Sequence, residues 1–365
     1  MEMQKFYRTK NTVFILLIVF FVTSVTVAGC FSLLPKVGNK FTDVAYATKS
    51  KTQKLDIYLP NEGKDPFPTI IAFHGGGFYE GNKSRQYTAP MLQGLNHGYA
   101  VVTVDYRLSD EAKFPAAIND AKAAIRFIRI NAAQYNLNPD KIALWGSSAG
   151  GNLAALAGTT GGTNNCYDKS LGNANVSDNV TAVVDWYGPT NFCVIDKQFN
   201  ESGIRGKVKG VQIYNTEGSS LSKYLGQNIF KVPDLCKEAD PTTYITSECP
   251  PFLIQHGILD SIVPMQQSVD LADAIAKKIG PDKVTLKLFD DAGHGGVPVT
   301  LLNGTYYYGY PFGTADNMDT VFAFLDKYMK LTPTPAPKLN PTPSPTPAPT
   351  PAFIPSPSNH SANGT

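Results

Sequence analysis

The 365-residue chain has almost no excess charge of either sign. Its 32 lysine and arginine residues nearly balance 30 aspartate and glutamate residues, which gives a net charge of +2 at pH 7. Proteins that bind nucleic acids carry clustered positive charge to meet the phosphate backbone, and no basic stripe is present here. The sequence therefore argues against a nucleic-acid partner.

Metal-binding spacings are also missing. The chain has five cysteines, and none lies in a Cys-x-x-Cys or histidine-rich context. We therefore expect neither a metal site nor a cofactor. Apart from Cys30, the cysteines are Cys166, Cys193, Cys236 and Cys249, an even number that permits two disulfides in an exported protein. The sequence leaves their pairing open.

The apolar run at the N-terminus is too short to cross a membrane, which takes about 20 residues. Residues 13–22 are apolar, follow a basic segment and precede small residues, a pattern that predicts a signal peptide at residues 1–29. Val27-Ala28-Gly29-Cys30 resembles a bacterial lipobox, in which Cys30 becomes the lipidated first residue. The alternative is an ordinary signal peptide with an incidental cysteine. We expect export, with the protein either secreted or held at the outer face of a bacterial membrane by lipid as its only membrane contact.

Apolar runs and helical periodicities alternate over the middle of the chain. Strands are expected at residues 41–48, 53–60, 69–73, 99–105, 142–145, 180–187, 251–256 and 284–289, with helices at 85–96, 116–134, 151–157, 264–279 and 316–328. This alternation predicts one α/β domain at residues 41–330, with a mostly parallel sheet and helices on both faces. Residues 138–140 suggest a turn.

Three other segments lack such a pattern. Residues 31–40 are predicted to be a short tether. Residues 190–245 are rich in Gly, Ser, Asn and Lys without periodicity, which indicates an insertion over the sheet. Residues 331–365 form a Pro/Thr-rich tail, where composition favours an extended linker with no capacity to form a core.

The stretch at residues 141–156, KIALWGSSAGGNLAAL, reads as strand, tight turn and helix. Its G-x-S-x-G motif, Gly146 to Gly150, would expose the Ser148 hydroxyl at the tip of the turn. The alternative is a Gly/Ser-rich loop without chemistry. Because a serine hydroxyl is a weak nucleophile, the functional interpretation requires a base close to Ser148.

His294 is the expected base, because it lies on a glycine-rich loop after the last predicted strand. Asp260, just after the preceding strand, is the expected acid that orients the imidazole. Asp290 and Asp291 are rivals, although they adjoin His294 in sequence and are better suited to shaping its loop. The order Ser148, Asp260, His294 is the one found when such triads are built on an α/β-hydrolase sheet.

Acyl transfer also needs N–H donors for the developing oxyanion. The amides of Gly75 and Gly76, after a buried strand, and of Ala149, at the start of a helix, are the candidates. Trp186 and Tyr187 follow another strand end, where they could stack on a sugar or phenolic group. Core packing is the alternative for this pair.

The motifs HGGGF, DYRL, GSSAGG, DWYGP, HGILDSIVP and AGHGG occur in that order. Over about residues 41–330 the chain resembles α/β-hydrolases related to hormone-sensitive lipase, most fully the branch with bacterial carboxylesterases and bifunctional feruloyl and acetylxylan esterases. The resemblance implies the catalytic and oxyanion residues named above, and implies that Asp105 and Arg107 brace the glycine loop. Phe78, which stands where tryptophan is common in related loops, joins the predicted substrate contacts.

These observations predict a serine carboxylesterase that forms an acyl-enzyme on Ser148. Its substrates would be short-chain acyl esters or esters linked to carbohydrate, with acetyl or feruloyl groups of plant polysaccharides favoured. A peptidase or amidase on the same fold is the first alternative. A surface-binding protein that keeps the fold without catalysis is the second.

Overall fold

The computed structural model describes residues 35–330, except 64–65, 298 and 308–310. The predicted signal peptide with Cys30 and the Pro/Thr-rich tail lie outside the described residues. Within the described ranges, no helix combines the length and the apolar composition that crossing a membrane requires.

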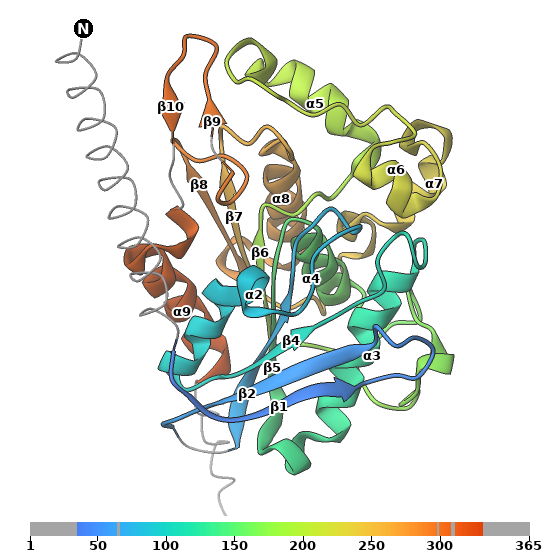
Figure 1. The fold of residues 1–365 in the computed structure, drawn as a ribbon, viewed down its shortest axis with the longest axis vertical. Helices are drawn as coiled ribbons and strands as arrows, with labels where there is room; N and C mark the ends of the chain where they lie inside the picture. The colour runs from blue at the N-terminus through green and yellow to red at the C-terminus, as the bar shows by residue number, and fades with distance from the viewer. Residues whose placement is uncertain (1–34, 64–65, 298, 308–310, 331–365) are drawn as a thin grey trace, which may run out of the picture. The chain divides into compact units, whose positions relative to one another are not determined.

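An eight-stranded sheet with the order β1-β2-β4-β3-β5-β6-β7-β8 forms the centre of the domain (Figure 1). Its strands are β1 (Val37–Ala45), β2 (Lys54–Pro60), β3 (Phe67–Phe73), β4 (Ala100–Val104), β5 (Leu137–Ser147), β6 (Ala182–Trp186), β7 (Phe252–Gly257) and β8 (Val284–Phe289). The pairs β1–β2 and β2–β4 are antiparallel, and all the others are parallel. The predicted mostly parallel sheet is confirmed, and β1 and β2 form an antiparallel hairpin at its edge.

Helices cover both faces of this sheet, because side chains alternate along its strands. On β3, Ile71 and Phe73 pack with α3 (Ala116–Ile130), α4 (Ala149–Thr159) and α8 (Gln266–Ile279) in one apolar core. Ile70 and Ala72 face the opposite core, with α2 (Arg85–Leu92) and α9 (Ala315–Met329). This is the α/β-hydrolase architecture expected from the sequence.

Two expectations about local structure are wrong. Strand β1 begins at Val37, inside the predicted tether and ahead of the strand expected at residues 41–48. Its first residues are largely exposed, so no hydrophobic alternation marks where the strand begins. Residues 138–140 lie within β5 rather than in a turn. Leu137 and Ile142 of β5 pair with Phe67 and Thr69 of β3. More residues lie between the first two than between their partners, so the extra residues of β5 form a bulge where the register shifts.

The insertion at residues 190–245 contains short helices that the sequence did not reveal. They are α5 (Ile195–Glu201), α6 (Ser220–Leu225) and α7 (Pro233–Glu238), which lie together at the upper right of Figure 1. Each is shorter than two turns, so none can show a clear helical periodicity. Another short element, the hairpin of β9 (Val299–Thr300) and β10 (Tyr306–Tyr307), follows β8.

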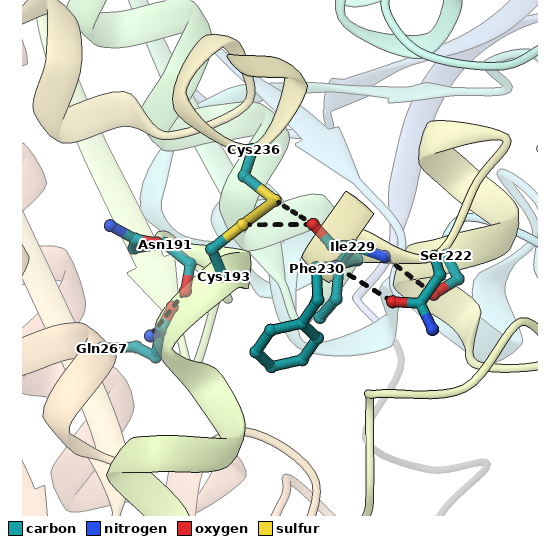
Figure 2. Close-up of a disulfide and its surroundings, with 8 residues drawn as sticks. Asn191, Cys193, Ser222, Ile229, Phe230, Cys236 and Gln267 are labelled. Carbon is teal, nitrogen blue, oxygen red and sulfur yellow. Dashed lines mark hydrogen bonds between the residues drawn. A yellow bond between two sulfur atoms is a disulfide. The ribbon is translucent and has the colours of Figure 1, made fainter. Parts of the chain in front are cut away.

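A disulfide between Cys193 and Cys236 joins the start of the insertion to α7 (Figure 2). Both sulfur atoms lie against the carbonyl oxygen of Ile229, at 3.2 and 3.3 Å. Cys166 and Cys249 form no disulfide and are free cysteines. The described residues therefore contain one of the two disulfides that the cysteine count permits, and it closes a 43-residue loop that includes α6.

Candidate active site

The turn between β5 and α4 presents Ser148 at the end of the sheet. Ser148 has φ 55° and ψ −122°, a conformation uncommon for a residue with a side chain. Its N–H donates to the carbonyl of Trp186 at 2.8 Å. A Cβ on Gly146 would lie 1.9 Å from the Gly150 carbonyl oxygen, and one on Gly150 would lie 2.1 Å from that of Phe73. The two glycines of the motif are therefore required for the chain to pass through this turn.

His294 contacts both other members of the predicted triad. Its Nε2 lies 2.8 Å from Ser148 Oγ, and its Nδ1 lies 2.7 Å from Asp260 Oδ2. Asp290 and Asp291, the rival acids, are exposed, and no hydrogen bond among the described residues joins either to His294. Since a carboxylate can only accept, His294 carries its proton on Nδ1 and offers the Nε2 lone pair to Ser148.

Asp260 is fully buried and surrounded by donors. Its Oδ1 accepts the N–H groups of Ile262 and Val263, both at 2.8 Å. Its Oδ2 accepts from His294 Nδ1 and lies 3.2 Å from Nε2 of His256. Burial raises the pKa of Asp260, but the charge of His294 and the hydrogen bonds from both histidines outweigh it and hold that pKa below its ordinary value. Asp260 therefore stays ionised and able to stabilise a protonated His294.

The predicted oxyanion residues line the same pocket as the triad serine and histidine. Gly75, Gly76 and Ala149 share it with Ser148 and His294. A Cβ on Gly75 would come within 3.3 Å of the Ser148 Cβ, so the glycine loop lies directly against the nucleophile turn. Ala149 opens α4, where backbone N–H groups have no partner within the helix. The loop and the helix start can thus offer amides to one oxygen bound beside Ser148.

His74 holds the glycine loop rather than acting as a base. Its ring stacks on Tyr106 with centroids 4.4 Å apart, and its Nδ1 lies 2.7 Å from the Gly75 carbonyl oxygen. The Tyr106 hydroxyl donates to the His74 carbonyl at 2.9 Å. Burial lowers the pKa of His74 to about 4, so its imidazole is neutral near pH 7.

Asp105 and Arg107 lie outside the pocket lining, as the resemblance implied. Asp105 Oδ1 accepts the N–H of Lys83, just beyond the glycine loop, at 2.6 Å. Arg107 donates twice to the buried carboxylate of Asp120, at 2.9 and 2.8 Å. Asp105 is therefore bonded close to the loop, whereas Arg107 anchors the segment after β4 to α3.

Replacing Gly76 with alanine should lower kcat about 10²- to 10³-fold, the usual cost of losing one oxyanion donor. Gly76 has φ +113°, and its Cβ would lie 2.1 Å from the Glu80 carbonyl oxygen. The Gly76 carbonyl also accepts from the N–H groups of Tyr79 and Glu80, both at 3.0 Å, so the turn cannot widen without losing these bonds. Initial rates on p-nitrophenyl acetate measure the effect. Gly206→Ala, at an exposed glycine with nothing near its Cβ, is the control; a wild-type kcat in the Gly76 variant would contradict the oxyanion role.

Trp186 does not contact the pocket, contrary to the prediction. It is fully buried, with its ring centroid 5.0 Å from that of Trp145 and 5.4 Å from that of Phe312. Alternation along β6 directs this side chain into the apolar core beneath α9. Core packing, the alternative weighed for this residue, describes its place in the structure.

Phe78 and Tyr187 reach the pocket, but both are engaged by neighbouring rings. The Phe78 ring is fully buried and stacks on Tyr224 of α6, with centroids 3.8 Å apart and planes 4° apart. Phe78 therefore ties the glycine loop to the insertion. Tyr224 covers one face of its ring, and its part as a substrate contact stays a prediction. Tyr187 lies edge-on to His294, with centroids 4.7 Å apart, and supports the imidazole from the pocket side.

The pocket has a volume of about 1030 Å³. Its wall includes insertion residues that the sequence did not single out: Gln212, Tyr214, Gly218, Ser219, Ser220, Leu221 and Lys223. The Tyr214 hydroxyl donates to the Ile262 carbonyl at 2.8 Å, which joins the insertion to the loop that carries Asp260. Within the described ranges, no group of three or more His, Cys, Asp or Glu side chains could hold a metal ion.

Asp185 gives the stability of the domain a distinct pH dependence. It is fully buried on β6, its Oδ1 accepts only the Gly188 N–H at 3.0 Å, and its Oδ2 has no partner among the described residues. Burial raises the pKa of Asp185 to about 6. The folded protein therefore binds this proton more tightly than the unfolded chain does, and stability is lost as the pH rises from about 4 through about 6.

As the pH rises from 4 to 8, the unfolding free energy of the wild-type protein should fall by about 2 kcal/mol relative to that of Asp185→Asn. The variant cannot ionise at this position, so the difference isolates Asp185 from other titrating groups. Urea unfolding of both proteins across this range measures it. Asp319→Asn, at an exposed aspartate, should follow wild type; parallel curves for wild type and Asp185→Asn would refute the assignment.

Comparison with known proteins gives a family and several relatives. The BD-FAE family model matches residues 55–275. The chain is 27% identical over 235 residues to a probable carboxylic ester hydrolase of Mycobacterium tuberculosis, LipM, covering 64% of this chain and 51% of that protein. It is likewise 27% identical over 245 residues to the esterase LipC of the same organism, covering 67% and 57%. The chain thus spans about half the length of the curated relatives it matches.

Solved structures show the same fold. A truncated carbohydrate esterase from gut microbiota superposes with a TM-score of 0.69 and 29% identity, over 81% of this chain and 99% of that one. A bifunctional GH43-CE protein of Bacteroides eggerthii gives a TM-score of 0.66 and 28% identity, over 80% of this chain and 35% of that one. Since the family model covers more than half of the chain, the protein belongs to the BD-FAE family, and its described domain has the α/β-hydrolase fold.

Proposed function

We propose that the protein is a serine carboxylesterase that carries the acyl group of its substrate on Ser148. The hydrogen-bonded series from Ser148 Oγ through His294 to Asp260 is the observation that carries this proposal. A hydroxyl, an imidazole and a buried carboxylate in this order are the groups that nucleophilic acyl transfer needs.

In the first half of the reaction, Ser148 Oγ attacks the ester carbonyl carbon while its proton passes to His294 Nε2. The imidazolium is stabilised by the ionised Asp260 at Nδ1. Negative charge forms on the former carbonyl oxygen, and the amides of Gly75, Gly76 and Ala149 are the donors proposed to hold it. The intermediate then collapses, the ester C–O bond breaks, and the alcohol leaves with the proton from His294.

In the second half, water attacks the acyl carbon of the acyl-enzyme and gives a proton to His294. The bond to Ser148 Oγ breaks, the proton returns to Oγ, and the carboxylic acid leaves. The net reaction consumes one ester and one water and yields one acid and one alcohol, with the triad restored.

The substrate class in this proposal is the short-chain acyl esters, with acetyl and feruloyl esters of plant polysaccharides as its natural members. Two similar structures are a carbohydrate esterase and a bifunctional GH43-CE protein, which supports carbohydrate-linked esters. The pocket wall supports them too, because Ser219, Ser220 and Gln212 bring hydroxyl and amide groups that can bond sugar hydroxyls.

The proposal places this enzyme outside the cytoplasm, anchored through lipid on Cys30 or secreted. The basic and apolar segments before Cys30 support it. Incorporation of a labelled fatty acid that is lost in Cys30→Ala tests the anchor, and an unlabelled wild-type protein would exclude it.

A fluorophosphonate probe and a substrate panel test the activity. The probe should modify Ser148 in a one-to-one ratio and abolish hydrolysis of p-nitrophenyl acetate. In the panel, acetylated xylan and methyl ferulate should be hydrolysed, whereas matched amides should not. No labelling would indicate a binding protein without catalysis, and faster turnover of amides than of esters would indicate the peptidase or amidase alternative.

A further inference from the structure

His256 lies directly behind the triad, although neither of its nitrogen atoms reaches the pocket. It is the fifth residue of β7 and is fully buried. Its Nδ1 lies 2.7 Å from the hydroxyl of Ser268 on α8. Its Nε2 lies 2.9 Å from the Val263 carbonyl oxygen and 3.2 Å from Oδ2 of Asp260. Among the described residues, all three hydrogen-bonding contacts of this ring thus belong to the segment that carries the acid or to the helix behind it.

The partners of His256 fix where its proton lies. A backbone carbonyl and an ionised carboxylate can only accept, so Nε2 must carry a hydrogen shared between Val263 and Asp260. In the neutral ring Nδ1 is then an acceptor, and the Ser268 hydroxyl donates to it. The result is a directed series of hydrogen bonds from Ser268 through His256 to Oδ2 of Asp260.

We propose that His256 is a positioning residue that sets the orientation of the Asp260 carboxylate. The inference rests on the proposed function, because it concerns how the acid serves His294. Two backbone amides hold Oδ1 of Asp260, and His256 supplies the only donor to Oδ2, among the described residues, that takes no part in proton transfer. Without it, the bond from His294 alone would have to keep Oδ2 in place while the His294 ring changes its charge.

His256 also shares the charge of Oδ2, so it should affect the proton affinity of His294. Its N–H withdraws part of the negative charge that a protonated His294 would meet. Removing that donor leaves a stronger negative potential at Nδ1 and stabilises the imidazolium form of His294. The other ionisable groups near His256 are Asp185 on β6, whose pKa responds to this ring, and Tyr187, whose ring lies 6.4 Å away.

Three substitutions test the proposal. His256→Leu removes both nitrogens; His256→Gln keeps an amide donor close to the position of Nε2; Ser268→Ala removes the donor to Nδ1. In His256→Leu, kcat should fall about 10- to 100-fold, comparable to the loss when a group that orients a metal ligand is removed. KM should change little, because His256 does not line the pocket. His256→Gln should recover most of the lost kcat, and Ser268→Ala should show a smaller loss.

The pH profile distinguishes positioning from a purely structural role. The acid limb of kcat/KM should move to higher pH in His256→Leu and return toward wild type in His256→Gln. A structural defect would instead lower the amount of folded enzyme and leave the limb in place. His97→Gln, which changes a histidine stacked on Phe322 away from the pocket, is the control.

Wild-type kcat and an unmoved acid limb in folded His256→Leu would overturn the proposal. If His256→Leu does not fold, Ser268→Ala decides: wild-type kcat and an unmoved acid limb in that variant would overturn the proposal as well. The proposed function fails separately, because hydrolysis that survives in Ser148→Ala refutes the triad, whereas hydrolysis lost in Ser148→Ala but intact in folded His256→Leu refutes only the positioning role.

Discussion

Ester hydrolysis should fall about 10⁴- to 10⁶-fold when Ser148 is replaced with alanine. The variant removes the oxygen that attacks the substrate, and His294 has no second hydroxyl within hydrogen-bond distance among the described residues. Triad members act as one unit, so removing the nucleophile forfeits the contribution of His294 and Asp260 as well. The remaining rate would come from the oxyanion donors and substrate binding alone.

Burst and steady-state rates on p-nitrophenyl acetate measure this loss, with thermal unfolding as a check that the variant is folded. The matched control is Ser147→Ala, because Ser147 precedes Ser148 in the same turn but has no hydrogen bond to His294. The control should keep its activity within about tenfold, while Ser148→Ala should also lose labelling by the fluorophosphonate probe. Activity that disappears in Ser147→Ala and survives in Ser148→Ala would show that Ser148 is not the nucleophile.

The arrangement of Ser148, His294 and Asp260 was predictable because each of these residues follows a strand of a parallel sheet. Strand ends meet at one edge of such a sheet, so residues 146 and 34 positions from His294 come together without any contact being visible in the sequence. Glycine spacing supplied the rest of the signal, because Gly146 and Gly150 are placed where no Cβ fits. The steric requirement for the two glycines and the common edge of the strand ends were sufficient to predict that these three residues lie together.

The side-chain environment of the site was harder to predict from the sequence. Whether an aromatic residue at a strand end faces substrate or core depends on alternation counted from the true strand boundary, and Trp186 faces the core. Phe78 is covered by Tyr224, a partner 146 positions away in an insertion without periodicity. His256 carries a partial signal, because it precedes Asp260 by four residues, yet only the fold shows that its ring turns back onto that carboxylate.

Replacing Asp260 with asparagine should lower kcat about 10⁴-fold, and the surroundings of the carboxylate explain why so small a change is so costly. All four neighbours of this group are N–H donors: the amides of Ile262 and Val263 at Oδ1, and the rings of His294 and His256 at Oδ2. An asparagine must place its own NH₂ against one of these pairs. At the position of Oδ1, the NH₂ group would face two backbone N–H groups. These cannot become acceptors, because backbone amides cannot lose their hydrogen.

The NH₂ group would therefore take the position of Oδ2, where a histidine can respond by changing tautomer. His294 would then accept at Nδ1 and carry its proton on Nε2, which leaves no lone pair to remove the proton of Ser148. We expect the loss in kcat, with KM almost unchanged and an equally slowed reaction with the fluorophosphonate probe. Asp290→Asn and Asp291→Asn, at the exposed aspartates beside His294, are matched controls that should stay close to wild type. An Asp260→Asn enzyme that retains a tenth or more of the wild-type kcat would show that the orientation of His294 does not depend on this carboxylate, and the acid would have to be sought elsewhere.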